Sequence, residues 1–319
     1  MTSSVRACAA LLVTATLCAQ ASAAHLTTVG DLAAGARPAG VPLNYVVTPN
    51  GLFHPSCVIE LADDDTLTAN GDMRHADGSV AATSATACAF PRYGARGQVV
   101  GQNEPQPEFD GWIAASDSNA NVTPAAKRMV GDFTVPNGPT SNVGQVLYYF
   151  PGLEDGQNVI TILQPVLAWN GFGDFRWTMT NWNCCNNGHT FHGGTINVST
   201  GDAIHGSMKG TGCAGSVCSN WKLVSKDNST GQATTFNTDS YGQAFDWYFG
   251  GVLEAYGVTQ CTHFPSNGGI TFTGVKVFDM SGTQSTPANW SSFISGGAPS
   301  CNFVVNATQH TTTITWKTN

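Results

Sequence analysis

Residues Val159–Trp169 read VITILQPVLAW, a run that is rich in β-branched and apolar residues and alternates as a strand does. In an extended chain, Ile160, Ile162, Gln164 and Val166 fall on one face. Runs of the same kind recur along the chain between clusters of Gly, Asn, Asp and Ser, and helical periodicity is nearly absent. This pattern predicts an all-β fold, either a sandwich or a barrel.

The predicted strands are short runs rich in Val, Ile, Thr, Phe, Tyr and Trp. In ITFTGVKVF, alternation puts Ile270, Phe272, Gly274, Lys276 and Phe278 on one face. The full set of predicted strands is Met129–Val135, Gln145–Phe150, Val159–Trp169, Phe175–Thr180, Thr195–Val198, Trp221–Ser225, Phe245–Phe249, Val252–Val258, Ile270–Phe278 and Thr311–Trp316.

The 319 residues are 41% apolar and only 11% charged, with 13 Lys and Arg against 21 Asp and Glu, for a formal net charge of -8. A chain of this size and composition buries a sizeable core. Its acidic balance argues against binding to nucleic-acid phosphates, and it offers no basic patch for an anionic membrane surface. We expect no nucleic-acid or membrane partner, no cofactor and a monomeric state.

The first 24 residues have the features of a secretory signal peptide. The stretch MTSSVRACAALLVTATLCAQASAA carries one arginine, Arg6, then an apolar run from Ala7 to Cys18, then small residues at 21–23. No later segment reaches the roughly 18 consecutive apolar residues that a membrane span needs. We expect a secreted, extracellular protein after removal of residues 1–24.

Residues 25–107 are polar, are interrupted by Pro and Gly, and contain two cysteines of their own. The stretch GQNEPQPEFDG, Gly101–Gly111, has the composition of a linker, with two prolines and three acidic residues. We therefore expect a propeptide or a small disulfide-linked N-terminal module over 25–107 and a β-sandwich domain over 108–319.

Ten cysteines are present, and removal of Cys8 and Cys18 with the signal peptide leaves eight. An even number in an exported chain favours disulfides over free thiols. The spacing contains no paired CxxC knuckles, which argues against a zinc site. From proximity in sequence we expect Cys57 with Cys88, Cys261 with Cys301, and Cys184, Cys185, Cys213 and Cys218 paired among themselves.

Two polar clusters have partial metal-ligand patterns. His189 and His192 in GHTFHGG lie three residues apart, but surface or turn histidines on a Gly-rich loop are the simpler interpretation. Asp63, Asp64 and Asp65 lack EF-hand spacing, which favours a solvated acidic turn over a calcium site. We expect no bound metal.

Several common catalytic motifs are absent from the sequence. It contains no GxSxG, no HExxH and no P-loop motif, so nothing predicts an α/β-hydrolase, a zincin or a P-loop enzyme.

Glu254 is one of only five glutamates in the chain. It interrupts the strand-like FGGVLEAYGV, in which Val252, Glu254 and Tyr256 share one face and Leu253 and Ala255 share the other. A carboxylate among such neighbours is partly removed from water, which raises its pKa and suits it to general acid and base work. The alternatives are an edge strand whose face lies in water, or an ion pair with an arginine.

Gln164 is the one residue on its strand face that needs hydrogen-bond partners. A buried amide without partners is costly, so Gln164 either joins a structural network or faces a cleft. Pro165, directly after it, predicts an edge strand, a bulge or a strand that crosses a groove. For the residue taken alone, a structural glutamine is the simpler interpretation.

Six segments, in their order along the chain, resemble the fungal glutamic peptidases called eqolisins and the related neprosin-like group. They are GWIAAS from 111, MVGDFTVP from 129, LYYFPGLEDGQNVITILQPVLAWN from 147, FRWTMTNWN from 175, INVSTGDAIHGSM from 196 and GGVLEAYGV from 250. The resemblance covers Gly111 to Phe278 and implies an antiparallel two-sheet, jelly-roll-like (concanavalin-like) β-sandwich. It also implies a secreted, acid-active endopeptidase whose substrate is a polypeptide.

The resemblance implies roles for individual residues. The catalytic glutamine of eqolisins falls on Gln164 and the catalytic glutamate on Glu254, and Trp182 would line the substrate cleft. In the implied mechanism, the glutamate takes a proton from the attacking water while the glutamine amide donates a hydrogen bond to the developing oxyanion. The pair of glutamates in neprosin-like enzymes would make Glu154 the alternative partner. The same analogy allows residues 25–107 to be an inhibitory propeptide removed in acid, whereas a cysteine pair of its own also suits a retained domain.

Two features depart from the eqolisin pattern: Pro165 follows ILQ, and the late strand has one glutamate where eqolisins have two.

A secreted carbohydrate-binding or carbohydrate-cleaving β-sandwich protein is the alternative function, because eight Trp with many Asn and Gly suit sugar recognition. A glycoside hydrolase would need a second carboxylate facing Glu254. A structural exported or coat protein is the third class and would have no pocket around Gln164 and Glu254.

Overall fold

The computed structural model describes residue 32 and residues 36–81, 87–101, 110–118, 123–297 and 299–319. Regular structure in these ranges is almost entirely strand, as the sequence predicts. The predicted signal peptide at 1–24 and the predicted boundary at 107/108 lie outside the described residues. No helix in the described part of the chain is long and apolar enough to cross a membrane.

The described part of the N-terminal segment, up to Val100, consists of short strands and a 3-10 turn, η2 (Pro55–Cys57). Four of these strands form a small sheet of their own in the order β1-β2-β7-β8. The strands are β1 (Val46–Thr48), β2 (Gly51–Phe53), β3 (Val58–Glu60), β4 (Thr66–Leu67), β5 (Met73–Arg74), β6 (Val80–Ala81), β7 (Arg92–Tyr93) and β8 (Val99–Val100).

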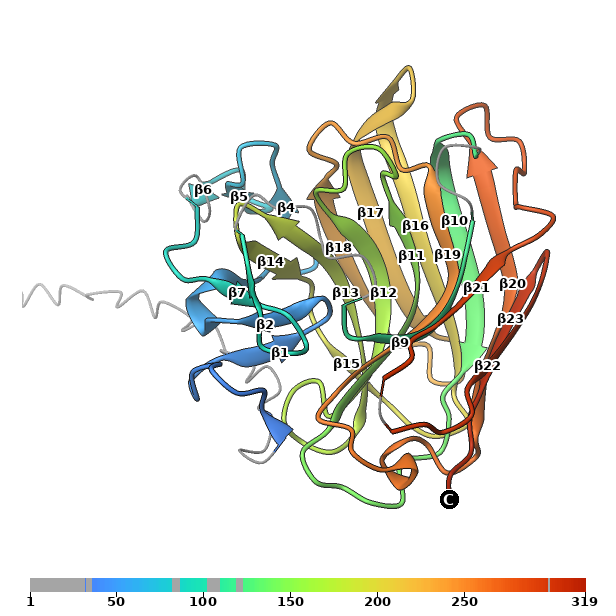
Figure 1. Ribbon diagram of the computed structural model, residues 1–319. Coiled ribbons are helices and arrows are strands. Elements are labelled where there is room, and N and C mark those ends of the chain that lie inside the picture. Colours follow the sequence, from blue (N-terminus) through green and yellow to red (C-terminus); the bar gives the residue numbers. More distant parts are fainter. Residues whose placement is uncertain (1–31, 33–35, 82–86, 102–109, 119–122, 298) are drawn as a thin grey trace, which may run out of the picture.

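Two large sheets form a β-sandwich, which confirms the predicted fold class (Figure 1). One has ten strands in the order β22-β23-β20-β10-β16-β17-β18-β4-β5-β6; the other has nine, in the order β21-β9-β19-β11-β12-β13-β14-β3, with β15 paired to β13. The remaining elements are β9 (Trp112–Asp117), β10 (Ala126–Thr134), β11 (Val146–Glu154), β12 (Ile162–Trp169), β13 (Trp177–Asn186), β14 (His189–His192), β15 (Ile196–Val198), β16 (Ala203–Ala214), β17 (Val217–Asp227), β18 (Ala233–Asp239), β19 (Trp247–Tyr256), the 3-10 turn η3 (Cys261–His263), β20 (Gly269–Asp279), β21 (Ser291–Ile294), β22 (Val304–Thr308) and β23 (Thr311–Thr315).

The main core lies between the two large sheets. Tyr149, Leu163 and Leu253 of the nine-stranded sheet and Met208 and Phe236 of the ten-stranded sheet belong to it, and all five are fully buried. Burial of each such apolar side chain contributes about 1.5–3 kcal/mol. Alternation along β11, β12 and β19 therefore fixes which residues face the sandwich interior and which face away from it.

The opposite face of the nine-stranded sheet carries a second apolar cluster, which the N-terminal segment completes. Tyr148, Phe150 and Val166 of the sheet pack with Val47 and Leu52 of β1 and β2. Val47 and Leu52 are fully buried although they belong to short strands. Figure 1 shows the N-terminal strands, blue to cyan, beside β13 and β14. The N-terminal segment thus covers one face of the sandwich.

The N-terminal segment also extends both large sheets at their edges. β3 pairs in parallel with β14, through Val58–Glu60 and Thr190–His192, and β4 pairs in parallel with β18. All other strand pairs in the described part of the chain are antiparallel, so both sheets are mixed. The parallel pairs occur where distant parts of the chain meet, because no tight hairpin there forces the strands to run in opposite directions.

The predicted alternation in ITFTGVKVF is wrong after Gly274. A register shift between β10 and β20 places one extra residue in β20, and Gly274 there has φ 58°. Before it Ile270 and Phe272 are buried; after it Val277 is buried and Lys276 is exposed. The bulge moves the second half of the strand onto the other face, which a period of two cannot foresee.

The predicted break between Phe245–Phe249 and Val252–Val258 is also wrong, because the continuous strand β19, Trp247–Tyr256, contains the end of the first segment and most of the second. Gly250 and Gly251 lie inside this strand at a register shift against β9. A Cβ atom on Gly251 would lie 2.3 Å from the ring of Phe272 in the facing sheet. The glycine therefore permits close approach of the two sheets instead of ending the strand.

All eight cysteines outside the predicted signal peptide are paired, as expected from their proximity in sequence. Cys57 pairs with Cys88 and Cys261 with Cys301. The other four pair among themselves, Cys184 with Cys185 and Cys213 with Cys218. The buried cluster that holds Cys57 and Cys88 also holds Cys184 and Cys185, so the N-terminal segment and β13 meet at these sulfurs.

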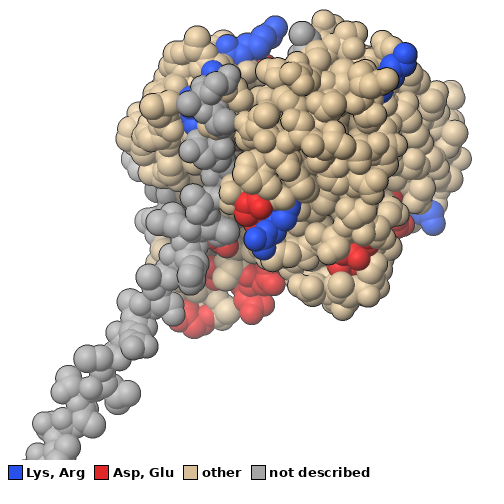
Figure 2. All heavy atoms as spheres, turned by 90° about the horizontal axis from the view of Figure 1, so that it is seen from below, with Lys and Arg blue, Asp and Glu red and all other residues tan. Residues whose placement is uncertain are grey.

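Charged side chains are sparse on the face drawn in Figure 2, where Lys, Arg, Asp and Glu form small separate groups among uncharged residues. This agrees with the low charged fraction of 11%. Recognition on such a surface depends mainly on shape, apolar contact and hydrogen bonds.

Candidate active site

Gln164 lies in the interior of the nine-stranded sheet, on β12 between β11 and β13. Of the three possibilities that Pro165 raised, an edge strand is therefore excluded. The pairing of β12 with β11 stops at Leu167 and resumes at Leu163. This interruption of the ladder accommodates a proline, which has no N–H to donate.

The amide of Gln164 faces the covered side of the sheet. Its neighbours Ile162 and Val166 belong to the apolar cluster on that side, as the alternation of VITILQPVLAW predicts. Gln164 is fully buried, and no described residue forms a hydrogen bond with its Nε2. A buried donor without a partner costs about 1–3 kcal/mol. A structural network, the simpler expectation, therefore does not explain this amide.

Glu254 lies on the same face, on β19, which is separated from β12 by the single strand β11. Val252 and Tyr256 share its face and belong to the same cluster, whereas Leu253 and Ala255 point into the main core. β19 lies between β9 and β11, so the alternative of an edge strand in water is wrong. The ion pairs among described residues do not include Glu254, so the arginine alternative is wrong as well.

The two oxygens of Glu254 have different surroundings. Oε1 accepts hydrogen bonds from the phenol of Tyr256 at 2.5 Å and from the backbone N–H of Asn50 at 2.6 Å. Oε2 is buried and has no hydrogen-bond partner among the described residues. Burial raises the pKa of Glu254 to about 8, and the hydrogen bonds from Tyr256 and Asn50 oppose this rise. Glu254 is thus the perturbed carboxyl that its sequence context predicts.

Asn50 joins the two residues and was not foreseen from the sequence. It occupies the tip of the β1–β2 hairpin with φ 73°, a left-handed conformation that asparagine tolerates. Its N–H binds Glu254, and its side-chain Nδ2 donates to Gln164 Oε1 at 3.4 Å. The stretch Pro49-Asn50-Gly51 is a turn signal, but nothing in it indicates contact with residues more than 100 positions away.

The hairpin that carries Asn50 is held from both sides. The phenol of Tyr148, on β11, donates to Val47 O at 3.1 Å. Within the hairpin, Thr48 Oγ1 donates to Gly51 O at 3.3 Å, and Thr48 is fully buried. The hairpin is therefore bonded to the sheet as well as within itself, and these bonds hold its tip, with Asn50, against the sheet face.

Trp182 lies directly opposite Gln164 across the β12–β13 pair. It is 1% exposed and belongs to the cluster on the covered face. Its ring lies 4.6 Å from the ring of His192, which is opposite it on β14. Trp182 is therefore a neighbour of Gln164 that the N-terminal segment shields from solvent in this structure.

Glu154, the alternative carboxylate, ends β11 opposite Trp247 and is 5% exposed. The hydrogen bonds through Asn50 connect Gln164 with Glu254 and do not include Glu154. The structure thus brings the glutamine and the late glutamate together around one residue.

The candidate metal ligands do not form sites in the described part of the chain, where no group of three or more His, Cys, Asp or Glu side chains is placed to hold an ion. His189 and His192 are buried on strand β14, so the expectation of surface or turn histidines is wrong. Three residues apart on a strand, they point to opposite faces and cannot share an ion.

The aspartates at 63–65 are only partly a solvated turn. Asp63 Oδ1 accepts from the Thr235 N–H at 3.1 Å, and Asp65 pairs with His75 at 3.0 Å and is buried. The side chains of Asp63 and Asp65 therefore tie the loop before β4 to β18 and to His75, which directly follows β5. Asp64 is exposed.

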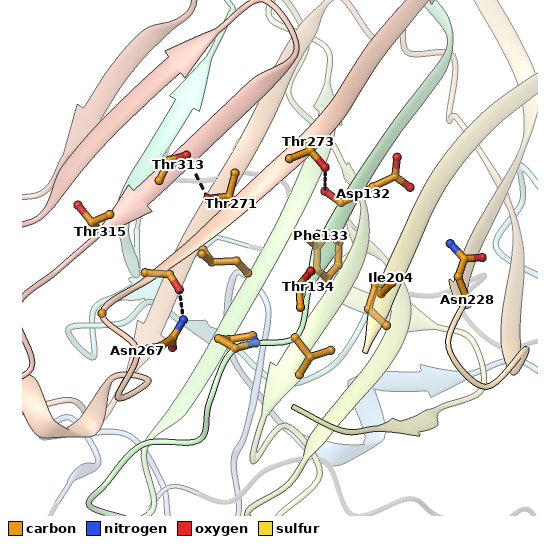
Figure 3. Close-up of a pocket in the computed structure, with 16 residues that line it drawn as sticks. Asp132, Phe133, Thr134, Ile204, Asn228, Asn267, Thr271, Thr273, Thr313 and Thr315 are labelled. Carbon is orange, nitrogen blue, oxygen red and sulfur yellow. Dashed lines mark hydrogen bonds between the residues drawn. The ribbon is translucent and has the colours of Figure 1, made fainter. Parts of the chain in front are cut away.

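A separate hollow of about 660 Å³ lies on the outer face of the ten-stranded sheet, among β10, β16, β20 and β23. Figure 3 shows Thr134, Thr271, Thr273 and Thr313 along it. Asp132 is the one titratable side chain among the described residues that line it. None of the candidate site residues from the sequence lines it, whereas Glu254, a buried carboxyl with a raised pKa, lies on the covered face of the other sheet. The covered face is therefore the better candidate for catalysis.

Comparison with known proteins gives structural likeness only: no family model and no curated protein matches the chain. Scytalido-glutamic peptidase with a peptide-based transition-state analog aligns with a TM-score of 0.46 and 14% identity, over 64% of this chain and 98% of that one. SCP-B, a member of the eqolisin family in complex with the tripeptide Ala-Ile-His, has a TM-score of 0.45 and 14% identity over the same shares. Aspergilloglutamic peptidase from Aspergillus niger has a TM-score of 0.41 and 15% identity, over 54% of this chain and 98% of that one. The chain is similar in fold to these peptidases.

Proposed function

We propose that this chain is a secreted glutamic endopeptidase of the eqolisin type, with Glu254 as general base and Gln164 as oxyanion donor. One observation carries the proposal: Glu254 Oε2 and Gln164 Nε2 lie on one sheet face and are both buried without partners among the described residues, while Asn50 contacts the other polar atom of each side chain. Two unsatisfied groups on one face cost stability, and a reaction that uses both explains their presence.

The chemistry requires a base and a hydrogen-bond donor on the two sides of a scissile peptide. Glu254 Oε2 takes a proton from water as the water oxygen bonds to the peptide carbonyl carbon. The carbonyl oxygen becomes an oxyanion, which accepts a hydrogen bond from Gln164 Nε2. Glu254 then returns the proton to the amide nitrogen as the C–N bond breaks. An oxyanion donor of this kind contributes about 3 kcal/mol in the transition state.

The β1–β2 hairpin, a segment of polypeptide that covers the candidate site, supports a polypeptide substrate. The β1–β2 hairpin is an extended chain packed on the sheet face, with Val47 and Leu52 buried and Val47 O accepting from Tyr148. A substrate strand in its place would use the same apolar surface, with Trp182 beside Gln164 as part of the cleft. Extended peptides commonly bind sheets through backbone hydrogen bonds and alternate side-chain pockets.

We propose that residues 25–107 are an inhibitory propeptide whose contact with the site is Asn50. The hairpin presents donors where a substrate presents an acceptor: an N–H to Glu254 and an amide N–H to Gln164 Oε1. No hairpin carbonyl accepts from Gln164 Nε2, which has no partner in the described part of the chain. The hairpin thus excludes water and substrate while offering no carbonyl for attack.

Activity in acid is consistent with removal of this cover. In the covered state, burial holds the pKa of Glu254 at about 8, and the carboxyl is protonated below that pH. Departure of the hairpin admits water, which lowers the desolvation penalty and brings the pKa toward its ordinary range. Glu254 is then able to act as a base in mildly acidic solution and as an acid in the second step.

The test is digestion of a denatured protein by the purified, acid-treated chain from about pH 2 to 7, with Glu254→Gln and Glu154→Gln as a matched pair of buried carboxyl variants. We expect cleavage that peaks in acid, falls at least about 100-fold in Glu254→Gln and persists in Glu154→Gln. If activity is lost in Glu154→Gln as well as in Glu254→Gln, the result would support the neprosin-like pair of Glu154 and Glu254 instead of Gln164 and Glu254. Absence of cleavage by folded protein freed of its N-terminal segment would overturn the proposal.

The carbohydrate alternative is weakened by the burial of the aromatic residues on which it depends. Seven of the eight tryptophans are at most 8% exposed and belong to the two apolar clusters. Sugar stacking needs an open aromatic face. A glycoside hydrolase also needs a second carboxylate facing Glu254, and the residue bridged to Glu254 is an amide, Gln164.

A further inference from the structure

Tyr256 contacts Glu254 from two positions further along the same strand. Its phenol donates to Glu254 Oε1 at 2.5 Å, and the side chain is 3% exposed. Unlike Asn50, which belongs to the N-terminal segment, Tyr256 lies in the sheet itself. This hydrogen bond therefore remains available to Glu254 when the hairpin leaves.

The surrounding backbone leaves room for the Tyr256 phenol. A Cβ atom on Gly111 would lie 2.9 Å from Tyr256 Oη, which is too close for an unstrained contact. Gly111 also has φ 80°, a backbone conformation that residues with side chains rarely adopt. Gly111 O also accepts the N–H of Ala255 at 2.9 Å, which fixes the loop against β19. On the other side, the ring of Tyr148 lies 6.2 Å from that of Tyr256 in an edge arrangement. The phenol is thus held in place by packing.

We propose that Tyr256 is a positioning residue for the base: by binding Oε1 it turns the free oxygen, Oε2, toward the water that attacks the substrate. This rests on the proposed function. The geometry distinguishes the two oxygens, since Tyr256 and Asn50 both donate to Oε1, whereas Oε2 has no hydrogen-bond partner among the described residues. Burial, followed by the neighbouring Glu254, raises the pKa of Tyr256 well above its ordinary value, so the phenol remains a donor throughout the acid range.

The role of Tyr256 follows from the proton balance of the reaction. When Oε2 receives the proton of water, Glu254 becomes neutral, and Oε1 still accepts from the phenol as a carbonyl oxygen. When Oε2 returns the proton to the leaving amine, the carboxylate is restored with the same bond on Oε1. The phenol loses no proton in either step. Its hydrogen bond favours the carboxylate, which counteracts burial and makes the base available at lower pH.

The test compares Tyr256→Phe with Tyr149→Phe in the acid-treated protein. Tyr149 is a buried tyrosine on the other face of the sheet whose hydroxyl has no described partner, so its variant controls for loss of a buried phenol. In Tyr256→Phe we expect kcat to fall about tenfold with KM changed less than about threefold, and the acid limb of the pH profile to move up by about one unit. Tyr149→Phe should leave the profile unchanged.

The outcomes separate this inference from the proposed function. A wild-type chain without peptidase activity overturns the proposed function; an active wild type with an unmoved acid limb in Tyr256→Phe overturns the role of Tyr256. If Tyr256→Phe does not activate in acid, the pKa of Glu254 in the intact chain is measured by infrared titration of the buried carboxyl. The inference requires that pKa to rise by about one unit in Tyr256→Phe and to stay fixed in Tyr149→Phe. Equal pKa values in all three proteins refute it.

Discussion

The backbone N–H of Asn50 donates a 2.6 Å hydrogen bond to Glu254 Oε1, although 204 residues separate the two in sequence. Through this bond the tip of an N-terminal hairpin covers a buried carboxyl whose pKa is raised to about 8 by desolvation. The state described here is thus a closed one, in which the candidate base and the candidate oxyanion donor are both in contact with the chain's own N-terminal segment.

Asn50→Pro should open the closed form. Proline has no N–H and cannot adopt the φ of 73° found at this position, so the bond to Glu254 is lost and the tip is displaced. We expect the untreated variant to hydrolyse a short fluorogenic peptide at least about tenfold faster than the untreated wild type. Asn50→Gly, which keeps both the left-handed backbone and the N–H, is the control and should stay near the wild-type rate. Identical rates for all three proteins would contradict the inhibitory role of the hairpin.

Gln164→Leu should separate activity from stability. Loss of the amide donor should lower kcat by about 100- to 1,000-fold. The same change removes a buried Nε2 for which the described residues supply no partner, so the free energy of unfolding should stay the same or rise by about 1 kcal/mol. Urea denaturation at pH 5 measures the second effect. A marked loss of stability would show that Gln164 belongs to a structural network.

The closed form should lose stability as the pH rises from about 5 to 8. The pKa of Glu254 is raised from 4.5 to about 8, so its contribution to the free energy of unfolding is fully present below pH 4.5 and is lost as the pH rises through 8. The slope is at most about 1.4 kcal/mol per pH unit. His192 acts in the opposite direction, because burial lowers its pKa and its contribution is lost as the pH falls.

The measurement for this effect is urea denaturation of the intact wild type and of Glu254→Gln at each pH unit from 5 to 8. The variant keeps every other titratable group, so the difference between the two curves reports Glu254 alone. Convergence of the two stabilities with decreasing pH is expected. Parallel curves would mean that Glu254 has an ordinary pKa in the closed form.

Cleavage of the chain between Val100 and Asp110 should release the N-terminal fragment under denaturing, non-reducing conditions. Cys57 pairs with Cys88 inside the fragment, and the pairs of Cys184, Cys213 and Cys261 lie in the sandwich. Under native conditions the fragment should stay bound through its pairing with β14 and β18. Electrophoresis with and without reductant checks this. A fragment released only by reductant would show bonds exchanged between Cys57 or Cys88 and the nearby Cys184–Cys185 pair.

Short-range pattern was enough to predict an all-β fold, a sandwich or a barrel, and the faces of its central strands; the resemblance to eqolisins selected the sandwich. Alternation places Gln164 with Ile162 and Val166, and Glu254 with Val252 and Tyr256, on one side of the sheet, as the structure has them. It failed at Gly274, where a bulge reverses the faces, and at His189 and His192, which are buried strand residues. A bulge adds one residue without changing composition, so the pattern contains no mark of it.

What the sequence alone determined is therefore local: the strand periodicity, the pairing of nearby cysteines and the unusual polar residues in two apolar strands. Which strands become neighbours, and what covers them, was decided only by the tertiary structure. Asn50 shows the difference, because its neighbours Pro49 and Gly51 predict a turn and no more. Its contacts with Gln164 and Glu254 arise because the apolar face of a sheet must be covered, and here the distant N-terminal segment supplies the cover.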